Sequence, residues 1–240
     1  MSDSRALLLM AQVLASTNSE ELFGAMSGAA QELGFNYSLY GIRVSLPGTQ
    51  EALQNIASAY PLAYQRIYQE RDFISRDPTV HHALTRPELL LWQDGMYSAQ
   101  SHEVMEESRQ FGLAFGLSAP VHEGANVRGM LSLARDKPIA SEAERLQLQA
   151  GAMVLANAVH FATSRIILPE LTRRRRPSLS VREMECLKWA AQGKSNSVIA
   201  DLTKVSEATV KFHISKVLQK LGVSTRQQAV ALAVALGLIS

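Results

Sequence analysis

The chain has 240 residues, of which 47% are hydrophobic and 19% charged, a composition typical of a soluble globular protein rather than a disordered or fibrous one. No apolar run reaches the roughly 18 residues that a membrane-spanning helix requires, and the single cysteine, Cys186, excludes an internal disulfide and fits a reducing compartment. The first residues have neither the basic start nor the small-residue cleavage site of a signal peptide, so we expect a cytoplasmic protein with no membrane partner.

The small net charge of +2 conceals a strong asymmetry along the chain. Residues 173–240 hold twelve lysines and arginines against four acidic residues, a net +8, whereas residues 1–172 hold twelve against eighteen, a net −6. This asymmetry predicts that only the C-terminal part binds a polyanion. We predict an N-terminal domain over 1–168, a linker over 169–178 and a C-terminal domain over 179–240.

Periodicity over the acidic part predicts an α+β fold. Apolar residues recur at helical spacing over 4–16, 19–33, 61–70, 101–111 and 141–167. Short β-branched and apolar runs predict strands over 37–45, 88–92, 117–123 and 127–134. Helices in this order around a few short strands predict an α/β/α sandwich with an antiparallel sheet.

The helix predicted over 61–70 carries a stripe of phenols. Tyr60, Tyr64 and Tyr68 recur every fourth residue, and Pro61 suits the first turn of a helix. Each buried hydroxyl needs a hydrogen-bond partner. Either neighbouring side chains supply these partners and form an internally bonded core, or a ligand enters and supplies them.

The helix predicted over 141–167 starts at a capping box formed by Ser141 and Glu144. One of its faces is apolar and contains Leu146, Ala150, Met153, Val154 and Phe161. Core packing is the default interpretation of such a face, and the residues that the core leaves over are candidates for a dimer contact.

The stretch LPELTRRRRPSL follows this helix. Pro169 and Pro177 flank four consecutive arginines, and we expect them to interrupt any helix. A solvated linker is the simplest interpretation of Arg173 to Arg176, and contact with phosphate groups is the second.

Helix-start and helix-stop signals divide the basic tail into four predicted helices, over 180–192, 195–202, 206–221 and 224–236. The signals are two capping boxes, two further N-cap serines and two C-terminal glycines, namely Ser180–Glu183, Ser224–Gln227, Ser195, Ser206, Gly193 and Gly222. They predict an all-α four-helix domain.

The third of these helices has one apolar face and one basic face. The short helix and tight turn before it make a helix-turn-helix, whose second helix can enter the major groove of DNA. Lys211 and Ser215 would then face base edges, whereas Lys194, Lys216 and Lys220 are placed for phosphates. The alternative is a solvated lysine face on a domain that binds protein, and the charge asymmetry favours DNA.

The tail resembles the DNA-binding domain of LuxR-type transcription regulators from Leu179 to Ala233. The matching positions are Glu183, Leu187, Gly193, Ile199, Ala200, Thr209, Val210, His213, Ile214, Lys220 and Leu221. Val198 departs from the family pattern, in which an acidic residue is usual. The resemblance implies a homodimer that binds a palindromic promoter site. Its candidate DNA-binding residues are Lys194, Ser195, Glu207, Ala208, Thr209, Lys211, Phe212, Ser215, Lys216 and Lys220.

The acidic part resembles the autoinducer-binding domain of the same regulators, in the quorum-sensing branch that binds N-acyl-homoserine lactones. The matching residues fall in order and are Tyr60, Tyr68, Asp77, Pro78, Trp92 and Gly116. The two resemblances together cover nearly the whole chain. They imply a dimeric regulator that senses a lactone and controls quorum-sensing target genes.

The resemblance also implies a role for each candidate ligand-binding residue. Asp77 accepts a hydrogen bond from the amide N–H of the lactone, and Tyr60 donates one to its amide carbonyl. Trp92 packs against the lactone ring, and Tyr68 closes the wall beside it. Ser132 donates to the amide carbonyl or to a 3-oxo or 3-hydroxy substituent. The candidate walls of the acyl-chain site are Leu39, Tyr40 and Ile42.

Tyr64 is the main departure from this pattern. The family usually has a tryptophan there, whose indole N–H donates to the ring carbonyl, and a tyrosine can also donate one hydrogen bond from farther out. We favour a lactone. The alternative is a LuxR-type regulator that answers a non-lactone small molecule or acts without a ligand. Asp77 before Pro78 also commonly begins a turn or helix and then needs no ligand.

Signals of catalysis are weak in this sequence. The six histidines do not show metal-ligand spacing with one another, and Cys186 has no cysteine partner. A nucleophile elbow and a phosphate-binding glycine loop are also missing. We therefore expect no catalytic residue, no metal site and no cofactor apart from the ligand.

Overall fold

The computed structural model describes residues 3–99 and 101–239, which form two compact units. The first unit comprises the residues up to Arg43 and Gln54–Leu168. The second unit comprises Val44–Leu53 and the residues from Pro169 on. Val44–Leu53 is the tip of a β-hairpin, and no feature of the sequence indicates that it groups with the C-terminal residues.

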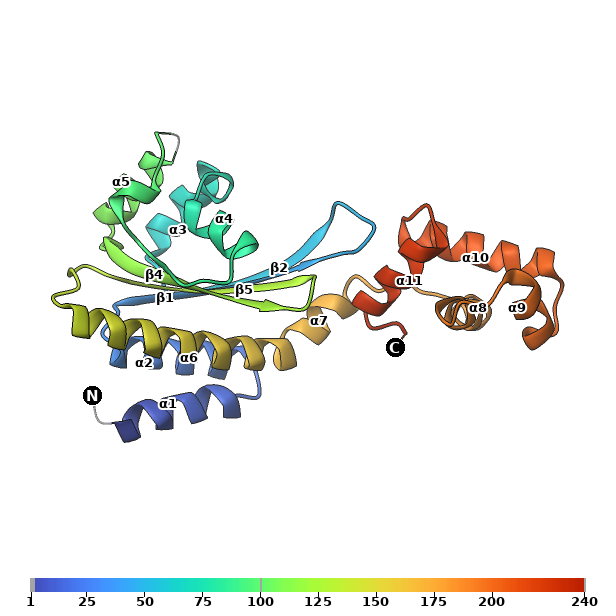
Figure 1. The fold of residues 1–240 in the computed structure, drawn as a ribbon, viewed down its shortest axis with the longest axis horizontal. Helices are drawn as coiled ribbons and strands as arrows, with labels where there is room; N and C mark the ends of the chain where they lie inside the picture. The colour runs from blue at the N-terminus through green and yellow to red at the C-terminus, as the bar shows by residue number, and fades with distance from the viewer. Residues whose placement is uncertain (1–2, 100, 240) are drawn as a thin grey trace. The chain divides into compact units, whose positions relative to one another are not determined.

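The described residues of the first unit form a five-stranded sheet with helices on both faces (Figure 1). Its strands are β1 (Tyr37–Ser45), β2 (Ala52–Ser58), β3 (Leu90–Leu91), β4 (Phe115–Glu123) and β5 (Val127–Arg135). They lie in the order β2-β1-β5-β4-β3, and β4 pairs with both β3 and β5 in antiparallel orientation. The predicted α+β sandwich is confirmed.

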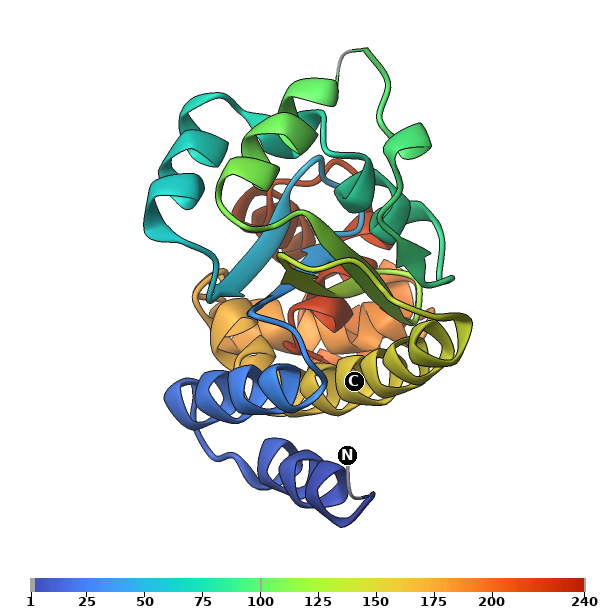
Figure 2. The same cartoon turned by 90° about the vertical axis from the view of Figure 1, so that its left-hand side faces the viewer.

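Two layers of helices enclose this sheet (Figures 1 and 2). One layer contains α1 (Asp3–Ala15), α2 (Ser19–Glu32) and α6 (Glu142–Ile166), and the other contains α3 (Leu62–Glu70), α4 (Pro78–Thr85) and α5 (His102–Gln110). Two short 3-10 turns, Phe73–Ser75 (η1) and Asp94–Met96 (η2), follow α3 and β3. Leu117, Leu131 and Leu155 are completely buried where α6 packs on β4 and β5.

The sequence does not predict β2 or α4, and it predicts a longer β3. β2 has the sequence ALQNIAS, in which polar Gln54 and Asn55 interrupt the apolar alternation that marks a strand. Its identity depends on pairing with β1, which is a tertiary contact. α4 has readable local signals, because the Asp77 side chain accepts from the Thr79 amide and Pro78 occupies the first turn.

The outward face of α6 corrects one prediction. Leu146, Met153, Val154 and Phe161 are 56%, 53%, 57% and 60% exposed, so the default assignment of this face to the core is wrong. The buried face is built instead from smaller residues between them, such as Ala152 and Ala156. The helix therefore has apolar residues on two sides, and one side is left uncovered.

The start of α6 also differs from the prediction. Ser141 accepts from the Glu144 amide at 3.1 Å, as an N-cap residue does. The Glu144 carboxylate accepts from the Ala140 amide and from Arg135 rather than from the Ser141 amide. The reciprocal half of the expected capping box is thus replaced by an ion pair with the end of β5.

The second unit contains the four predicted helices at slightly shifted bounds, namely α8 (Val181–Ala191), α9 (Asn196–Thr203), α10 (Glu207–Leu221) and α11 (Arg226–Ala235). The capping box of Ser180 and Glu183 is confirmed. The last capping box lies one residue later than predicted, at Thr225 and Gln228. Cys186 is buried in the core beneath α9 and α10.

The first half of the predicted linker is helical, against the expectation that Pro169 interrupts any helix. A short helix, α7 (Leu168–Arg173), occupies it, because Pro169 sits in the first turn, where its missing amide hydrogen costs nothing. Glu170 accepts from Arg173 and Arg174 across one turn of this helix. Arg176 donates to the Leu236 carbonyl at 2.7 Å. The arginine run is thus partly engaged in contacts within the second unit.

Candidate ligand cavity and nucleic-acid interface

A cavity of about 410 Å³ lies in the first unit. Its walls come from β1, β2 and β5 of the sheet and from α3, η1, α4 and α5 on the side opposite α6. The lining is mostly apolar, with polar groups at its ends, as small-molecule sites commonly are. Among the predicted ligand-binding residues, those on this lining are Leu39, Tyr60, Tyr64, Tyr68, Asp77, Trp92 and Ser132.

The phenols gather at one end of the cavity. Tyr60 is 8% exposed and Tyr64 is 5% exposed, and their ring centres lie 6.3 Å apart. Tyr64 also contacts Tyr68, with 5.8 Å between ring centres. Burial raises the pKa of all three hydroxyls above the ordinary value of a phenol, so they are neutral donors at physiological pH.

Two of these hydroxyls have no protein partner among the described residues. The Tyr60 hydroxyl is buried and makes no hydrogen bond, although the Ser132 hydroxyl lies near enough to influence its pKa. Tyr64 likewise makes ring contacts but no hydrogen bond through its hydroxyl. An unpaired buried hydroxyl costs about 1–3 kcal/mol, so this end of the cavity favours a polar guest.

Asp77 is only partly satisfied by the protein. Its Oδ1 accepts from the amide and the hydroxyl of Thr79 at 2.8 and 2.7 Å, which caps α4. Its Oδ2 accepts from the Tyr68 hydroxyl at 2.9 Å. Tyr68 is the partner that Oδ2 has among the described residues, so this oxygen keeps a lone pair for a donor in the cavity. Burial raises the pKa of Asp77 above its ordinary value.

A chain of hydrogen bonds fixes Trp92 and Ser132 beside the phenols. The Trp92 indole donates to the Ser118 hydroxyl at 3.0 Å, and Ser118 pairs with Ser132 at 3.0 Å across the β4–β5 hairpin. The indole N–H of Trp92 therefore already has a partner, and the residue borders the cavity with its ring rather than with this donor. Gly116 does not line the cavity. A Cβ there would come within 2.8 Å of Trp92, so the glycine makes room for the ring.

The residues predicted to form the wall of the acyl-chain site lie on different faces of β1. Leu39 lines the cavity. Ile42 also borders it, but its side chain is buried in the same core cluster as Tyr40, on the α6 side of the sheet. Tyr40 lies on the other side of the sheet, where its hydroxyl bonds His160 Nδ1 at 2.6 Å, so its assignment to the cavity wall is wrong. Alternation along β1 is the reason, because neighbouring residues point to opposite faces.

Sequence reasoning missed much of the cavity wall. The unassigned polar lining residues are Arg43, Gln54, Ser58, Gln65, Gln69, Asp72, Thr79, Tyr97, Ser108 and Arg128. Alternation from Leu39 along β1, or from Ser132 along β5, would have indicated Arg43, Met130 and Arg128. No signal in the sequence pairs β2 with β1, so Gln54 could not be found.

The second unit contains the predicted helix-turn-helix, α9 and α10. Ser195 and Ser206 cap these helices by accepting from Val198 and Thr209. Lys204 adopts a left-handed conformation, with φ of 55°, at the turn between them. This turn leaves α10 with one face on α8 and α9 and the other exposed.

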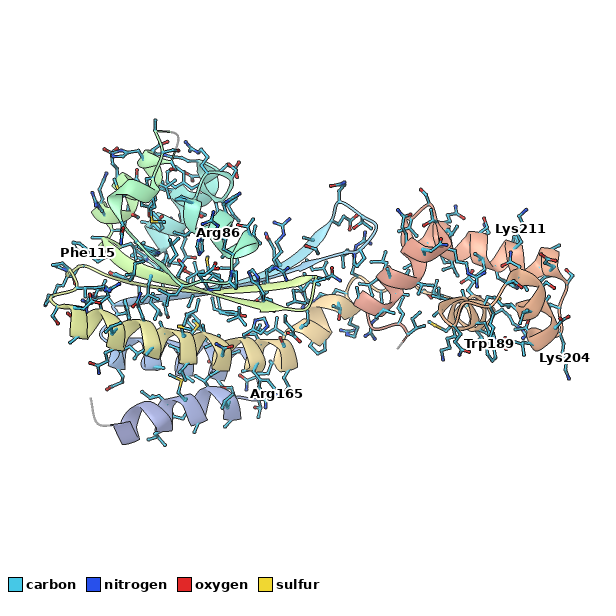
Figure 3. All side chains as sticks on the ribbon, viewed as in Figure 1. Arg86, Phe115, Arg165, Trp189, Lys204 and Lys211 are labelled. Carbon is cyan, nitrogen blue, oxygen red and sulfur yellow. The ribbon has the colours of Figure 1, made fainter. Side chains whose placement is uncertain are left out.

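Most of the predicted DNA-binding side chains are exposed. These are Lys194, Ser195, Glu207, Ala208, Lys211, Phe212, Ser215, Lys216 and Lys220, while Thr209 is half-buried beside Ser206. Figure 3 shows Lys211 projecting from α10 away from α8 and α9. Phe212 is 57% exposed, and the Lys216 ammonium lies 5.8 Å from its ring centre.

Lys220 differs from the other lysines. Its ammonium pairs with Glu183 at 2.7 Å and donates to the Ser178 carbonyl at 3.0 Å. Glu183 is 6% exposed, and hydrogen bonding by Lys220 holds the pKa of that carboxyl below its ordinary value. Lys220 therefore ties α10 to the start of α8, a structural role that the assignment to phosphates did not foresee.

No cluster of three or more metal-ligating side chains occurs among residues 3–99 and 101–239. In the same part of the chain, no helix has both the length and the apolar character to cross a bilayer.

Comparisons with known proteins agree with this architecture. Residues 18–163 match the family model described as the autoinducer binding domain, and residues 177–233 match that of bacterial regulatory proteins of the luxR family. The transcriptional activator protein SolR of Ralstonia nicotianae is 34% identical over 91% of this chain and 92% of its own. The transcriptional activator protein AnoR of Acinetobacter nosocomialis is 33% identical over 96% of this chain and 97% of its own.

A solved full-length structure has the same fold. Escherichia coli SdiA matches with a TM-score of 0.74 at 25% identity, over 98% of each chain. SdiA in complex with octanoyl-rac-glycerol gives a TM-score of 0.74 at 26% identity, over 99% of this chain and 98% of that one. The chain therefore belongs to the LuxR family of quorum-sensing transcription regulators, with an autoinducer-binding domain and a DNA-binding helix-turn-helix domain, and is not an enzyme.

Proposed function

We propose that this regulator senses an N-acyl-homoserine lactone, binds a palindromic promoter site as a homodimer and controls quorum-sensing target genes in the bacterial cytoplasm. The observation that carries this proposal is the buried, unpartnered Tyr60 hydroxyl in a cavity that Tyr64 and Asp77 also line. A lactone head group has an amide N–H and two carbonyls, which complement one carboxylate and two phenols.

The ligand contacts follow from this complementarity. Asp77 Oδ2 accepts from the amide N–H, and Tyr60 donates to the amide carbonyl with Ser132 beside it. Tyr64 donates to the ring carbonyl in place of the usual tryptophan, and the ring packs on the face of Trp92. Tyr68 serves mainly to orient Asp77, because its hydroxyl already donates to the carboxylate. Leu39 contacts the acyl chain.

The exposed face of α6 supports a homodimer. Leu146, Met153, Val154 and Phe161 recur at intervals of seven, one and seven residues, so they form one stripe along the helix. An uncovered apolar stripe of this length marks a protein contact. Two copies of α6 packed along this stripe would link two DNA-binding units in one dimer, and a palindrome offers one half-site to each unit.

The identity of the ligand can be tested through its effect on the stability of the folded protein. A ligand that binds only the folded state stabilises the protein by about 4 kcal/mol at a thousandfold excess over Kd. A panel of lactones with different acyl lengths should therefore include members that raise Tm by several degrees. No shift with any member, and no small molecule extracted from the purified protein, would contradict the proposal.

A second candidate ligand class is a non-lactone amphiphile. Tyr64 favours it, because a phenol both donates and accepts whereas an indole N–H only donates. The SdiA complex contains octanoyl-rac-glycerol, an ester with free hydroxyls. Mass spectrometry of the extracted ligand distinguishes an acyl glycerol from a lactone, and an empty cavity in a DNA-competent protein would favour ligand-independent action.

A further inference from the structure

The end of the cavity away from the phenols is polar and cationic. Arg43, Gln54 and Arg128 all line it. The hydrogen bonds from the Ala59 amide to the Ser38 carbonyl and from the Leu46 amide to the Glu51 carbonyl belong to one antiparallel register of β1 with β2. That register places Gln54 directly opposite Arg43, so the two side chains share a face.

β5 sets the distance between the two polar ends. Arg128 and Ser132 both line the cavity and lie four residues apart on this strand. Four residues of an antiparallel strand span about 13 Å. Met130 lies between them on the same face, and Ile56 of β2 adds to this apolar middle. An extended acyl chain of about ten carbons covers a similar length, since each tetrahedral carbon advances it by roughly 1.3 Å.

The charges at this end are not neutralised by the described residues. Arg43 is exposed and makes no hydrogen bond or ion pair there. Arg128 donates one guanidinium nitrogen, Nη1, to the carbonyls of Gly124 and Val127 and has no carboxylate partner. The acidic residues on the cavity wall are Asp72 and Asp77, and neither forms an ion pair with these arginines.

We propose that the cognate ligand has two polar ends, with an acyl group that terminates in a carboxylate bound by Arg43 and Arg128. The ligand is then the mono-amide of a dicarboxylic acid of about ten carbons with homoserine lactone. A carboxylate matches the planar guanidinium fork and forms charge-assisted hydrogen bonds with it. A terminal methyl would instead dehydrate cationic groups without compensation. This inference rests on the proposed lactone function and specifies its ligand class.

The test compares two ligands of equal chain length on the full-length protein. One is decanoyl-homoserine lactone, and the other is the mono-amide of decanedioic acid with homoserine lactone. Calorimetric titration at pH 7 should give at least about tenfold tighter binding of the carboxylate form, as for other charge-assisted contacts. The preference should fall as salt is added, because partly exposed charges are screened.

Substitution assigns the preference to the arginines. Arg43→Gln with Arg128→Gln should remove the preference by weakening binding of the carboxylate form, while decanoyl-homoserine lactone should bind at least as tightly as it does to the unmodified protein. Arg66→Gln is the matched control, because Arg66 is exposed on α3 and does not line the cavity. It should bind both ligands as the unmodified protein does.

The outcomes separate this inference from the proposed function. Binding of the decanoyl lactone without preference for the carboxylate form overturns the inference and leaves lactone sensing intact. A preference that persists in the double variant also overturns it. Failure of both ligands, together with failure of the whole lactone panel, contradicts the proposed function itself.

Discussion

The Tyr68 hydroxyl donates a 2.9 Å hydrogen bond to Asp77 Oδ2, while Asp77 Oδ1 accepts twice from Thr79. One carboxylate thus caps α4 and faces a cavity at the same time. The cap stabilises the start of α4 whether or not a ligand is bound, and the remaining lone pair of Oδ2 can accept from a ligand.

Asp77→Asn should abolish the response to lactone and leave the fold intact. Asparagine is as good an N-cap as aspartate, so α4 is retained, but the charged acceptor for the amide N–H is lost. Far-ultraviolet circular dichroism and the ligand-induced Tm shift measure the two effects separately. Retention of the shift would remove Asp77 from the binding site.

The titration of Asp77 gives the ligand-free protein a pH dependence. Burial raises its pKa in the folded state, so folding favours the protonated form. The resulting stabilisation is complete below the ordinary pKa of an aspartate and is lost as pH rises through the raised value. Asp77→Asn does not titrate, so its stability relative to the unmodified protein should increase with pH across that window. Parallel denaturant titrations at several pH values measure this difference, and a constant difference would contradict it.

Tyr60→Phe and Tyr68→Phe should have opposite effects on the ligand-free protein. Tyr60 has a buried hydroxyl without a partner, so its removal should leave stability unchanged or raise it by about 1 kcal/mol. Tyr68 loses a hydrogen bond to a carboxylate, which should cost about 1–2 kcal/mol. Tyr60→Phe should nevertheless weaken lactone binding about tenfold or more. Equal losses of stability in urea titrations would mean that Tyr60 has an internal partner after all.

Met153→Glu with Phe161→Glu should produce a folded monomer. Both side chains are more than half exposed on α6, so the charges do not disturb the core but oppose association along the apolar stripe. Leu62→Glu is the matched control, since Leu62 is 72% exposed on α3, on the other side of the sheet. Sedimentation velocity reports the mass, and a dimer that survives in the double variant would place the contact elsewhere.

Lys211→Ala and Lys220→Ala should separate DNA readout from stability. Lys211 projects from α10 without a protein partner among the described residues, so its loss should weaken specific DNA binding and leave Tm unchanged. Lys220 neutralises the buried Glu183, so its loss should lower Tm by several degrees. Footprinting and thermal melts test the pair, and an unchanged footprint for Lys211→Ala would put the base contacts elsewhere on α10.

Local signals in the sequence determined the helices of the second unit. Ser180, Ser195 and Ser206 each bond to an amide three residues ahead, so the start of each helix is encoded within one turn. Glycines 193 and 222 adopt the positive φ that ends a helix. The last helix begins one residue later than predicted, because the Thr225 hydroxyl rather than that of Ser224 accepts from an amide of its first turn.

Tertiary structure alone decided the shape of the cavity and the free face of α6. Periodicity identifies an apolar stripe on a helix but carries no information about which neighbour, if any, covers it. The sequence indicated Tyr60, Asp77 and Trp92 as site residues. Arg43, Gln54 and Arg128 line the same cavity because β1, β2 and β5 belong to one sheet, and the sequence does not indicate this pairing. Caps are hydrogen bonds between near neighbours in the chain, so they can be predicted from the sequence. A cavity is the space left among strands and helices that are distant in sequence, so its shape is known only from the tertiary structure.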